Sequence, residues 1–412
     1  MKYISLLVVA CLAWSSSSAD AASATFIGSG PNAVNGTAAA GSYIVVLKDN
    51  LSATSASFGS KLNNLVHKVH NGRNGGSKLS LQHSFESFPG YHIRATGNNP
   101  HQALTELLNM EEIDYIEQDQ VVTINQGTQN NPPSWGLPRV SQRGGLRNQR
   151  TAYKFPDQAG AGVTAYVIDT GINTGHVEFQ GRARMGANFV RGSPNTDENG
   201  HGTHVSGTIG GATFGVAKKV TLVGVKVLNA QGQGLNSAIV AAMDWVAKNN
   251  RGKKAVVNMS LGGGSSRAVN DAAARLFQAN VPVIVAAGND AQQNACNGSP
   301  SGAPAAFAVG ASDIQDNVAS FSSFGQCVKI FGPGVQITSA WIGSSNARNT
   351  ISGTSMATPH VVGVAALYLS SQSNLRTASQ VYQTLAMTAT KNAVRGNLRG
   401  SANLLVFNGA SR

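Results

Sequence analysis

The chain of 412 residues is long enough for one large globular core together with smaller parts. Hydrophobic residues make up 42% of it and charged residues only 12%, a composition that excludes a disordered chain. The net charge of +12 comes from residues 126–412, which hold 24 Lys and Arg against 10 Asp and Glu. These basic residues form no dense run interleaved with aromatics, which argues against nucleic-acid binding.

Residues 1–21 are expected to be a secretory signal peptide. Lys2 precedes the apolar run ISLLVVACLAW, and the small residues SSSSADA follow it. The run is too short to span a membrane, and no later stretch reaches about 18 apolar residues. We therefore expect a secreted, extracellular protein with no membrane partner. Cys11 leaves with the signal, and in an oxidising compartment Cys296 and Cys327 are expected to form a disulfide rather than a metal site or a nucleophile.

Residues 22–126 are expected to form a small α+β domain after an Ala/Gly/Ser-rich linker over 22–40. Strands are predicted at 42–48, 91–96 and 114–124. Helices are predicted at 54–70, from the spacing of apolar residues, and at 99–110, with Asn99 as the cap and Pro100 in the first turn. The Pro/Asn-rich sequence TQNNPPSWG at 128–136 marks a domain boundary.

Residues 127–412 show the pattern of an α/β domain. Short apolar strands are predicted at 162–169, 221–228, 255–262 and 281–289, and helices at 238–249 and 272–280. Strands that are apolar on both faces are typical of a mostly parallel sheet covered by helices.

Three stretches of this domain carry candidate catalytic residues. VIDTGI places Asp169 at the end of a buried strand, where open α/β sheets hold their ligands. DENGHGTHVSGTIGG begins a helix of small residues at His201. SGTSMATPH places Ser355 at a helix N-terminus, whose amides and dipole favour developing negative charge. Each stretch alone also fits a structural role, such as a turn or a helix cap.

Two other enzyme classes share parts of these motifs. Asp-Thr-Gly is also the signature of aspartic proteases, but that chemistry needs a second such carboxylate and an all-β fold, and the chain has no second copy. His201 and His204 lie three residues apart, whereas zinc hydrolases of the His-Glu-x-x-His type need a glutamate and a spacing of four. No metal ligand is therefore assigned.

Asp, His and Ser occur here in the chain order of subtilisin. The motifs DTGI, HGTHV and GTSMATPH resemble the three signatures of subtilisin-like serine proteases. GVAKKVTLVGVKVL, NMSLGGG and VAAGN extend the resemblance to the proteinase K branch, over nearly all of residues 132–408. The resemblance implies a subtilisin-like three-layer α/β fold with a mostly parallel sheet over residues 127–412. Residues 42–124 resemble the inhibitory propeptide of the family, which implies a ferredoxin-like propeptide domain within 22–126.

The resemblance also implies a role for each site residue. Ser355 would attack the peptide carbonyl, His201 would take its proton, and Asp169 would orient the imidazole. Asn289 would hold the oxyanion. The substrate would lie as an extended strand between two glycine-containing segments, with an apolar pocket for the residue before the cut. The residues assigned to substrate binding are Gly232, Gly234, Ser260, Leu261, Gly262, Gly263, Ala286, Ala287 and Gly288.

Two departures from the branch concern specificity. Asn236 and Gly298 stand where its members usually carry tyrosines, so both pockets are expected to be roomier. Protein and peptide substrates and the chain's own propeptide are the implied partners, for an enzyme that is expected to be a monomer. The alternative from another class is a catalytically inactive binding or structural protein with the same fold.

No cofactor is implied for catalysis, but the branch carries a tight structural calcium site. Its ligands are two backbone carbonyls, here near Pro304 and Ala306, and an aspartate whose position holds Lys329. Calcium needs hard anionic oxygens, so the usual site is expected to be lost. Lys329 would either occupy the calcium position and donate to those carbonyls or point into solvent. Other calcium sites, for example around Asp197, stay open.

Overall fold

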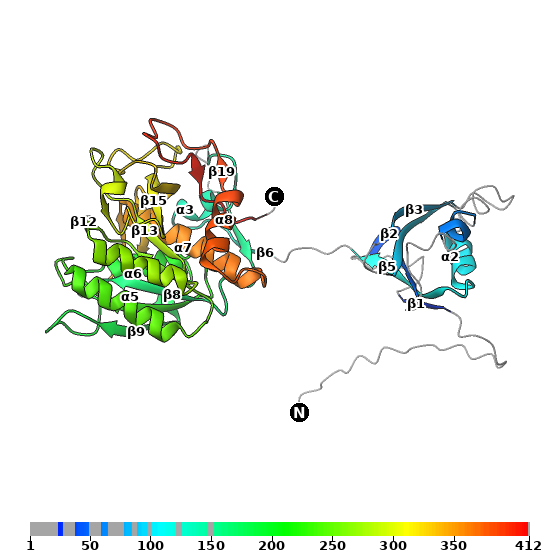
Figure 1. Cartoon of the computed structure of the whole chain (residues 1–412), viewed down its shortest axis with the longest axis horizontal. Coiled ribbons are helices and arrows are strands. Elements are labelled where there is room, and N and C mark those ends of the chain that lie inside the picture. The colour runs from blue at the N-terminus through cyan, green and yellow to red at the C-terminus, as the bar shows by residue number, and fades with distance from the viewer. Residues whose placement is uncertain are drawn as a thin grey trace, which may run out of the picture. The chain divides into compact units, whose positions relative to one another are not determined.

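The computed structural model describes residues 24–27, 38–48, 59–64, 78–84, 89–97, 100–120, 126–146 and 151–410. The chain divides into two compact units, Met1–Thr123 and Ile124–Arg412 (Figure 1). The expected signal peptide and the expected helix cap at residue 99 lie outside the described residues. Within those ranges, no helix is long and apolar enough to cross a membrane.

The first unit is a five-stranded sheet packed against two helices. Its strands are β1 (Thr25–Ile27), β2 (Ala38–Leu47), β3 (Lys78–Ser84), β4 (Gly90–Thr96) and β5 (Ile113–Gln120), in the spatial order β1-β5-β2-β4-β3. The helices are residues 59–64 and α2 (Pro100–Leu108). Leu62, Leu104 and Leu107 of these helices join the buried core of the sheet. From β2 to β5 the elements follow the order β-α-β-β-α-β, which confirms the predicted ferredoxin-like fold.

Two strands of this unit were not expected. β3 carries one buried residue, Leu79, and otherwise exposed side chains, and the alternation in its sequence stops after Leu79 and Leu81. β1 lies in the segment predicted to be a linker, and it pairs in parallel with β5. The aromatic rings of Phe26 and Tyr43 lie 6.3 Å apart, which helps to attach β1 to the core. The linker prediction is therefore wrong at β1 and at the start of β2.

The second unit contains a nine-stranded sheet in the order β19-β20-β16-β15-β13-β11-β8-β10-β9. Its strands are β8 (Thr164–Asp169), β9 (Ala183–Asn188), β10 (Thr221–Lys226), β11 (Ala255–Met259), β13 (Val283–Ala286), β15 (Ala306–Ser312), β16 (Val328–Pro333), β19 (Thr390–Lys391) and β20 (Leu404–Leu405). All neighbouring pairs are parallel except β19 and β20. The predicted mostly parallel sheet is confirmed.

Helices cover both faces of this sheet. Alternate strand residues face opposite sides, because successive side chains of a strand point in opposite directions. Ile168 and its equivalents pack against α5 (Asn236–Asn250) and α6 (Arg267–Gln278), which lie side by side in front of the sheet (Figure 1). Val167 and its equivalents pack against α4 (His201–Gly210) and α7 (Thr354–Ser371). The predicted three-layer architecture is thus confirmed.

The remaining elements are short and surround the sheet. Three small antiparallel pairs are β6 (Gln126–Gln129) with β7 (Tyr153–Pro156), β12 (Gly263–Gly264) with β14 (Gly298–Ser299), and β17 (Ile337–Ala340) with β18 (Arg348–Ile351). The short helices are α3 (Gly136–Val140), η1 (Val177–Phe179) and η2 (Ala295–Asn297), and α8 (Ala378–Thr388) follows α7.

Candidate active site

The first two candidate residues meet at the carboxyl end of the sheet. Asp169 is the last residue of β8 and is fully buried, and His201 is the first residue of α4. His201 Nδ1 lies 2.8 Å from Asp169 Oδ1, the same oxygen that accepts from Thr170 N at 2.7 Å. When Nδ1 carries the proton, Nε2 of the imidazole is left free to accept one.

Glycines allow α4 to approach the end of β8 this closely. A Cβ on Gly202 would lie 2.1 Å from the carbonyl oxygen of Gly171, so no side chain fits there. Gly200 caps the helix with a φ of +102°, a conformation that favours glycine. The motif around His201 is therefore rich in small residues because the backbone of α4 touches the turn after Asp169.

Ser355 lies in the first turn of α7, the helix that packs against α4. Its side chain is half-buried, and Oγ donates to the backbone carbonyl of Ser260 at 3.0 Å. Ser260 Oγ in turn donates to the carbonyl of Ser355 at 2.9 Å. This reciprocal pair joins the start of α7 to the segment after β11. Rotation of the Ser355 hydroxyl away from Ser260 is needed before it can donate to an imidazole, and active-site hydrogen bonds commonly tighten only when substrate binds.

The side-chain amide of Asn289 is held by the residue before Ser355. Asn289 Oδ1 accepts from Thr354 N at 2.8 Å and from Thr354 Oγ1 at 2.9 Å. Two donors fix the oxygen end of the amide, so Nδ2 is the end that remains free to donate. Thr354 is fully buried, and its Oγ1 also accepts from Gly288 N at 3.2 Å. The sequence did not single out Thr354, although it lies within the GTS motif.

Two clefts flank these residues. The first, of about 350 Å³, borders Ser355 and Asn289, and the second, of about 560 Å³, borders His201. Leu261, Gly262 and Gly263 line both clefts. The other predicted substrate-binding residues divide between them: Ala286, Ala287 and Gly288 line the first, with Gly298, and Gly232, Gly234 and Ser260 line the second, with Asn236. The sequence missed Gln293, Ala295 and Ser301 in the first cleft and Asn199, Leu228 and Ile239 in the second.

The electrostatic surroundings of the histidines differ. Burial disfavours the charged form of His201, but the charge and hydrogen bond of Asp169 and the charge of Asp197 outweigh this and raise its pKa. Burial lowers the pKa of His204 to about 3 and that of His360 to about 4. Of these three histidines, His201 is therefore the one whose surroundings favour taking up a proton.

The structure does not support a zinc site at His201 and His204. His204 Nε2 lies 3.0 Å from the carbonyl oxygen of Ile337, and its ring packs edge-on against Trp341. His201 directs Nδ1 at Asp169. In the described ranges, no three His, Cys, Asp or Glu side chains converge as a metal site.

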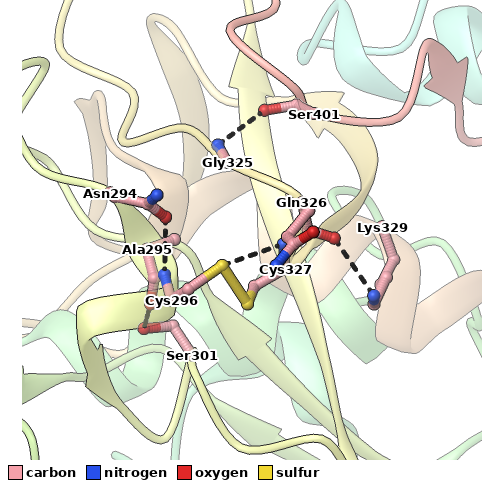
Figure 2. The surroundings of a disulfide bond; sticks show 9 residues. All are labelled: Asn294, Ala295, Cys296, Ser301, Gly325, Gln326, Cys327, Lys329 and Ser401. Atoms are coloured by element: carbon pink, nitrogen blue, oxygen red, sulfur yellow. Dashed lines mark hydrogen bonds between the residues drawn. A yellow bond between two sulfur atoms is a disulfide. The ribbon is translucent and has the colours of Figure 1, made fainter.

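The hypothesis that Lys329 donates to the carbonyls near Pro304 and Ala306 is wrong. Lys329 is exposed on β16, and its Nζ donates to the carbonyl of Gln326 at 3.1 Å (Figure 2). Successive side chains of a strand point to opposite sides, so Lys329 points outward while the residues on either side of it are buried. The matching of ligand positions along the sequence does not reveal this direction. Position 329 therefore provides no carboxylate for a calcium ion.

The expected disulfide joins Cys296 and Cys327. Their Cα atoms lie 5.4 Å apart, and Cys327 N donates to Cys296 Sγ at 3.2 Å (Figure 2). Asn294 accepts from Cys296 N, and Ser301 Oγ donates to Ala295 O at 2.7 Å. The bridge therefore fixes the η2 segment, and its residue Ala295, together with nearby Gly298 and Ser301, lines the first cleft.

Comparison with known proteins agrees with this arrangement. Residues 160–402 match the Subtilase family, and residues 42–125 match Peptidase inhibitor I9. The chain is 42% identical to Subtilisin-like protease 2 of Pseudogymnoascus destructans over 89% of both chains. It is 49% identical to an Extracellular serine proteinase of Thermus sp. over 75% of this chain and 73% of that one. A crystal structure of a cold adapted subtilisin-like serine proteinase matches 67% of this chain and 98% of its own, with 48% identity and a TM-score of 0.63.

The two family matches do not overlap, since the inhibitor match ends at residue 125 and the subtilase match begins at residue 160. β1 lies ahead of the residues that match the inhibitor family. The chain belongs to the subtilase family of serine proteases and carries an I9 inhibitor domain ahead of the catalytic unit.

Proposed function

We propose that the protein is a secreted serine endopeptidase that cleaves peptide bonds through an acyl-enzyme formed on Ser355. His201 acts as general base towards Ser355 and then as general acid towards the leaving amine, and Asp169 orients the imidazole and stabilises its charged form. The observation that carries the proposal is the convergence of α4 and α7 at the end of β8, with both clefts opening beside it.

Asn289 Nδ2 and the backbone N–H of Ser355 stabilise the tetrahedral oxyanion. The fixed orientation of the Asn289 amide supports this role, because a donor that is already aimed costs no reorganisation when charge develops. Ser355 also lies in the first turn of the 18-residue helix α7, whose dipole favours negative charge.

The substrate lies as an extended strand between residues 232–234 and 260–263. Gly263 lines both clefts, and a Cβ on it would meet no atom within 4 Å, so a substrate backbone has room to approach this segment closely. Main-chain pairing reads few side chains, which favours broad specificity. The first cleft accepts the residue before the cut. Beside Gln293 and Ser301 it is lined by alanines, glycines and Leu261 and by no charged residue, which favours an apolar or aromatic side chain.

The chain is made as a zymogen that processes itself. The signal peptide ends near residue 21 and the propeptide near residue 126, close to the start of β6 at Gln126. Residues 105–119 hold six carboxylates and no Lys or Arg, whereas residues 126–412 carry a net positive charge. This charge difference favours the propeptide as an inhibitor of its own catalytic unit.

Replacement of Ser355 by alanine tests the function. The full chain with Ser355→Ala, produced in a host without secreted proteases, is expected to accumulate uncut and to hydrolyse no casein. Asp313→Asn, a change in a surface loop remote from both clefts and from the processing site, serves as the control and is expected to mature normally. A Ser355→Ala chain that matures would exclude self-processing, and one that hydrolyses casein would exclude Ser355 as the nucleophile. A wild-type chain that stays uncut in this host and hydrolyses no casein would favour the binding-protein alternative.

A further inference from the structure

We propose that Asp197 is a positioning residue that holds the segment of Asp169 and the helix of His201 together in the geometry the reaction requires. The proposal rests on the function above, in which these two residues act on Ser355. Asp197 touches neither Ser355 nor the substrate clefts, and its effect is transmitted through the residues it binds.

One oxygen of the Asp197 carboxylate binds the turn that follows Asp169. Oδ1 accepts from Thr170 Oγ1 at 2.8 Å. Thr170 is the neighbour whose N–H donates to the Asp169 carboxylate, and its hydroxyl accepts from Gly202 N at 2.8 Å. Thr170 thus touches Asp169 through its backbone N–H and joins Asp197 to α4 through its hydroxyl, so its position sets the spacing of Asp169 and His201.

The same carboxylate also binds the start of α4. Oδ1 accepts from Asn199 N at 3.0 Å and Gly200 N at 2.9 Å, and Oδ2 accepts from Thr203 N at 2.9 Å and Thr203 Oγ1 at 2.6 Å. The helix has no acidic residue in its first turn and no side-chain cap from Gly200. Asp197 supplies the missing negative charge and acceptors from outside the helix.

Five donors occupy the two oxygens of this carboxylate, which is only 6% exposed. A carboxylate so fully bonded to protein donors has little capacity left for calcium, and these contacts argue against the site that the sequence left open here. The buried negative charge also favours the protonated form of His201, which forms during the reaction.

Replacement of Asp197 by asparagine tests whether this residue positions the catalytic residues and supports protonated His201, or only stabilises the fold. An amide has one acceptor oxygen, so its NH2 group must face either the Thr170 side or the Thr203 side, where donors already point at it. We expect kcat to fall about tenfold to a hundredfold with KM changed less than about twofold, because a misplaced general base affects the chemical step. The acid limb of kcat/KM is expected to move to lower pH, because a charge that supports protonated His201 has been removed.

Asp313→Asn is the matched control. Asp313 accepts from Gln315 N, Asn317 N and Asn317 Nδ2 in a surface loop, and it lines neither cleft. This variant is expected to leave kcat and the acid limb unchanged. If Asp197→Asn does not fold, Thr170→Val breaks the same link without removing the charge. Thr170→Val is expected to lower kcat and leave the acid limb in place, and Thr170→Ser is expected to recover most of the loss.

An active wild-type enzyme whose Asp197→Asn variant keeps kcat and the acid limb would overturn the proposal. Equal losses of kcat in Asp197→Asn and Asp313→Asn would also overturn the proposal, since the effect would then be a general loss of stability. If Asp197→Asn does not fold, a wild-type kcat in Thr170→Val would overturn the proposal. An inactive wild-type enzyme would instead contradict the proposed function.

Discussion

Removal of the Cys296–Cys327 disulfide is expected to destabilise the catalytic unit by an amount that follows from the loop it closes. The two cysteines are separated by 31 residues, for which the chain-entropy relation gives about 3.7 kcal/mol. A domain of about 290 residues unfolds with an entropy of about 0.6 kcal/mol per kelvin. The double variant Cys296→Ser/Cys327→Ser is therefore expected to melt about 6 °C lower than the parent.

Differential scanning calorimetry of the inhibited enzyme measures this shift without self-digestion. The bridge also fixes the segment that contributes Ala295, Gly298 and Ser301 to the first cleft, so KM for an aromatic peptide substrate is expected to rise as well. A melting shift below about 1 °C would refute the entropic reasoning, and two free thiols in the denatured, unreduced parent would refute the bridge itself.

Three further predictions concern catalysis, pH and calcium. Asn289→Ala is expected to lower kcat by roughly 10²–10³, the loss known for the corresponding donor of subtilisin. Thr354→Val is expected to lower kcat by less, since only one of the two donors that anchor the Asn289 amide is lost. A wild-type kcat in steady-state assays of Asn289→Ala would remove this residue from the mechanism. Burial holds the pKa of His204 at about 3 and that of His360 at about 4 in the folded chain, whereas both histidines take up protons near pH 6.5 in the unfolded chain. The melting temperature should therefore fall as the pH drops below about 6.5. A constant melting temperature down to about pH 4.5 contradicts this. Since Lys329 stands where the calcium-binding carboxylate is expected, EDTA should shift the melting temperature by less than about 2 °C, and a larger loss restored by calcium would show that the ion is bound elsewhere.

Four central strands of the parallel sheet were predictable because they are apolar over most of their length and α5 and α6 follow two of them. β8, β10, β11 and β13 all lie within the predicted ranges. β3 was not predictable, since its side chains are mostly exposed and its order comes from pairing with β4. β1 has only three residues and depends on the distant strand β5, so no local pattern identifies it.

The candidate site was predictable as far as its motifs reach. The sequence indicates Asp169, His201 and Ser355, and the structure places the first two in hydrogen-bond contact. The supporting residues could not be predicted from the sequence, because their roles arise from contacts between distant segments. Thr354 reaches Asn289 across 65 residues, and nothing in its own surroundings reveals that partner.

The most direct test of the account is the site of covalent labelling by a serine-reactive phosphonyl fluoride. Mass spectrometry of the inactivated mature enzyme is expected to find one adduct per molecule, on the peptide that contains Ser355. The His201→Ala variant is expected to label far more slowly, because the general base is missing. An adduct on another residue that accompanies the loss of activity, or full inactivation with Ser355 unmodified, would contradict the assignment of Ser355 as the nucleophile.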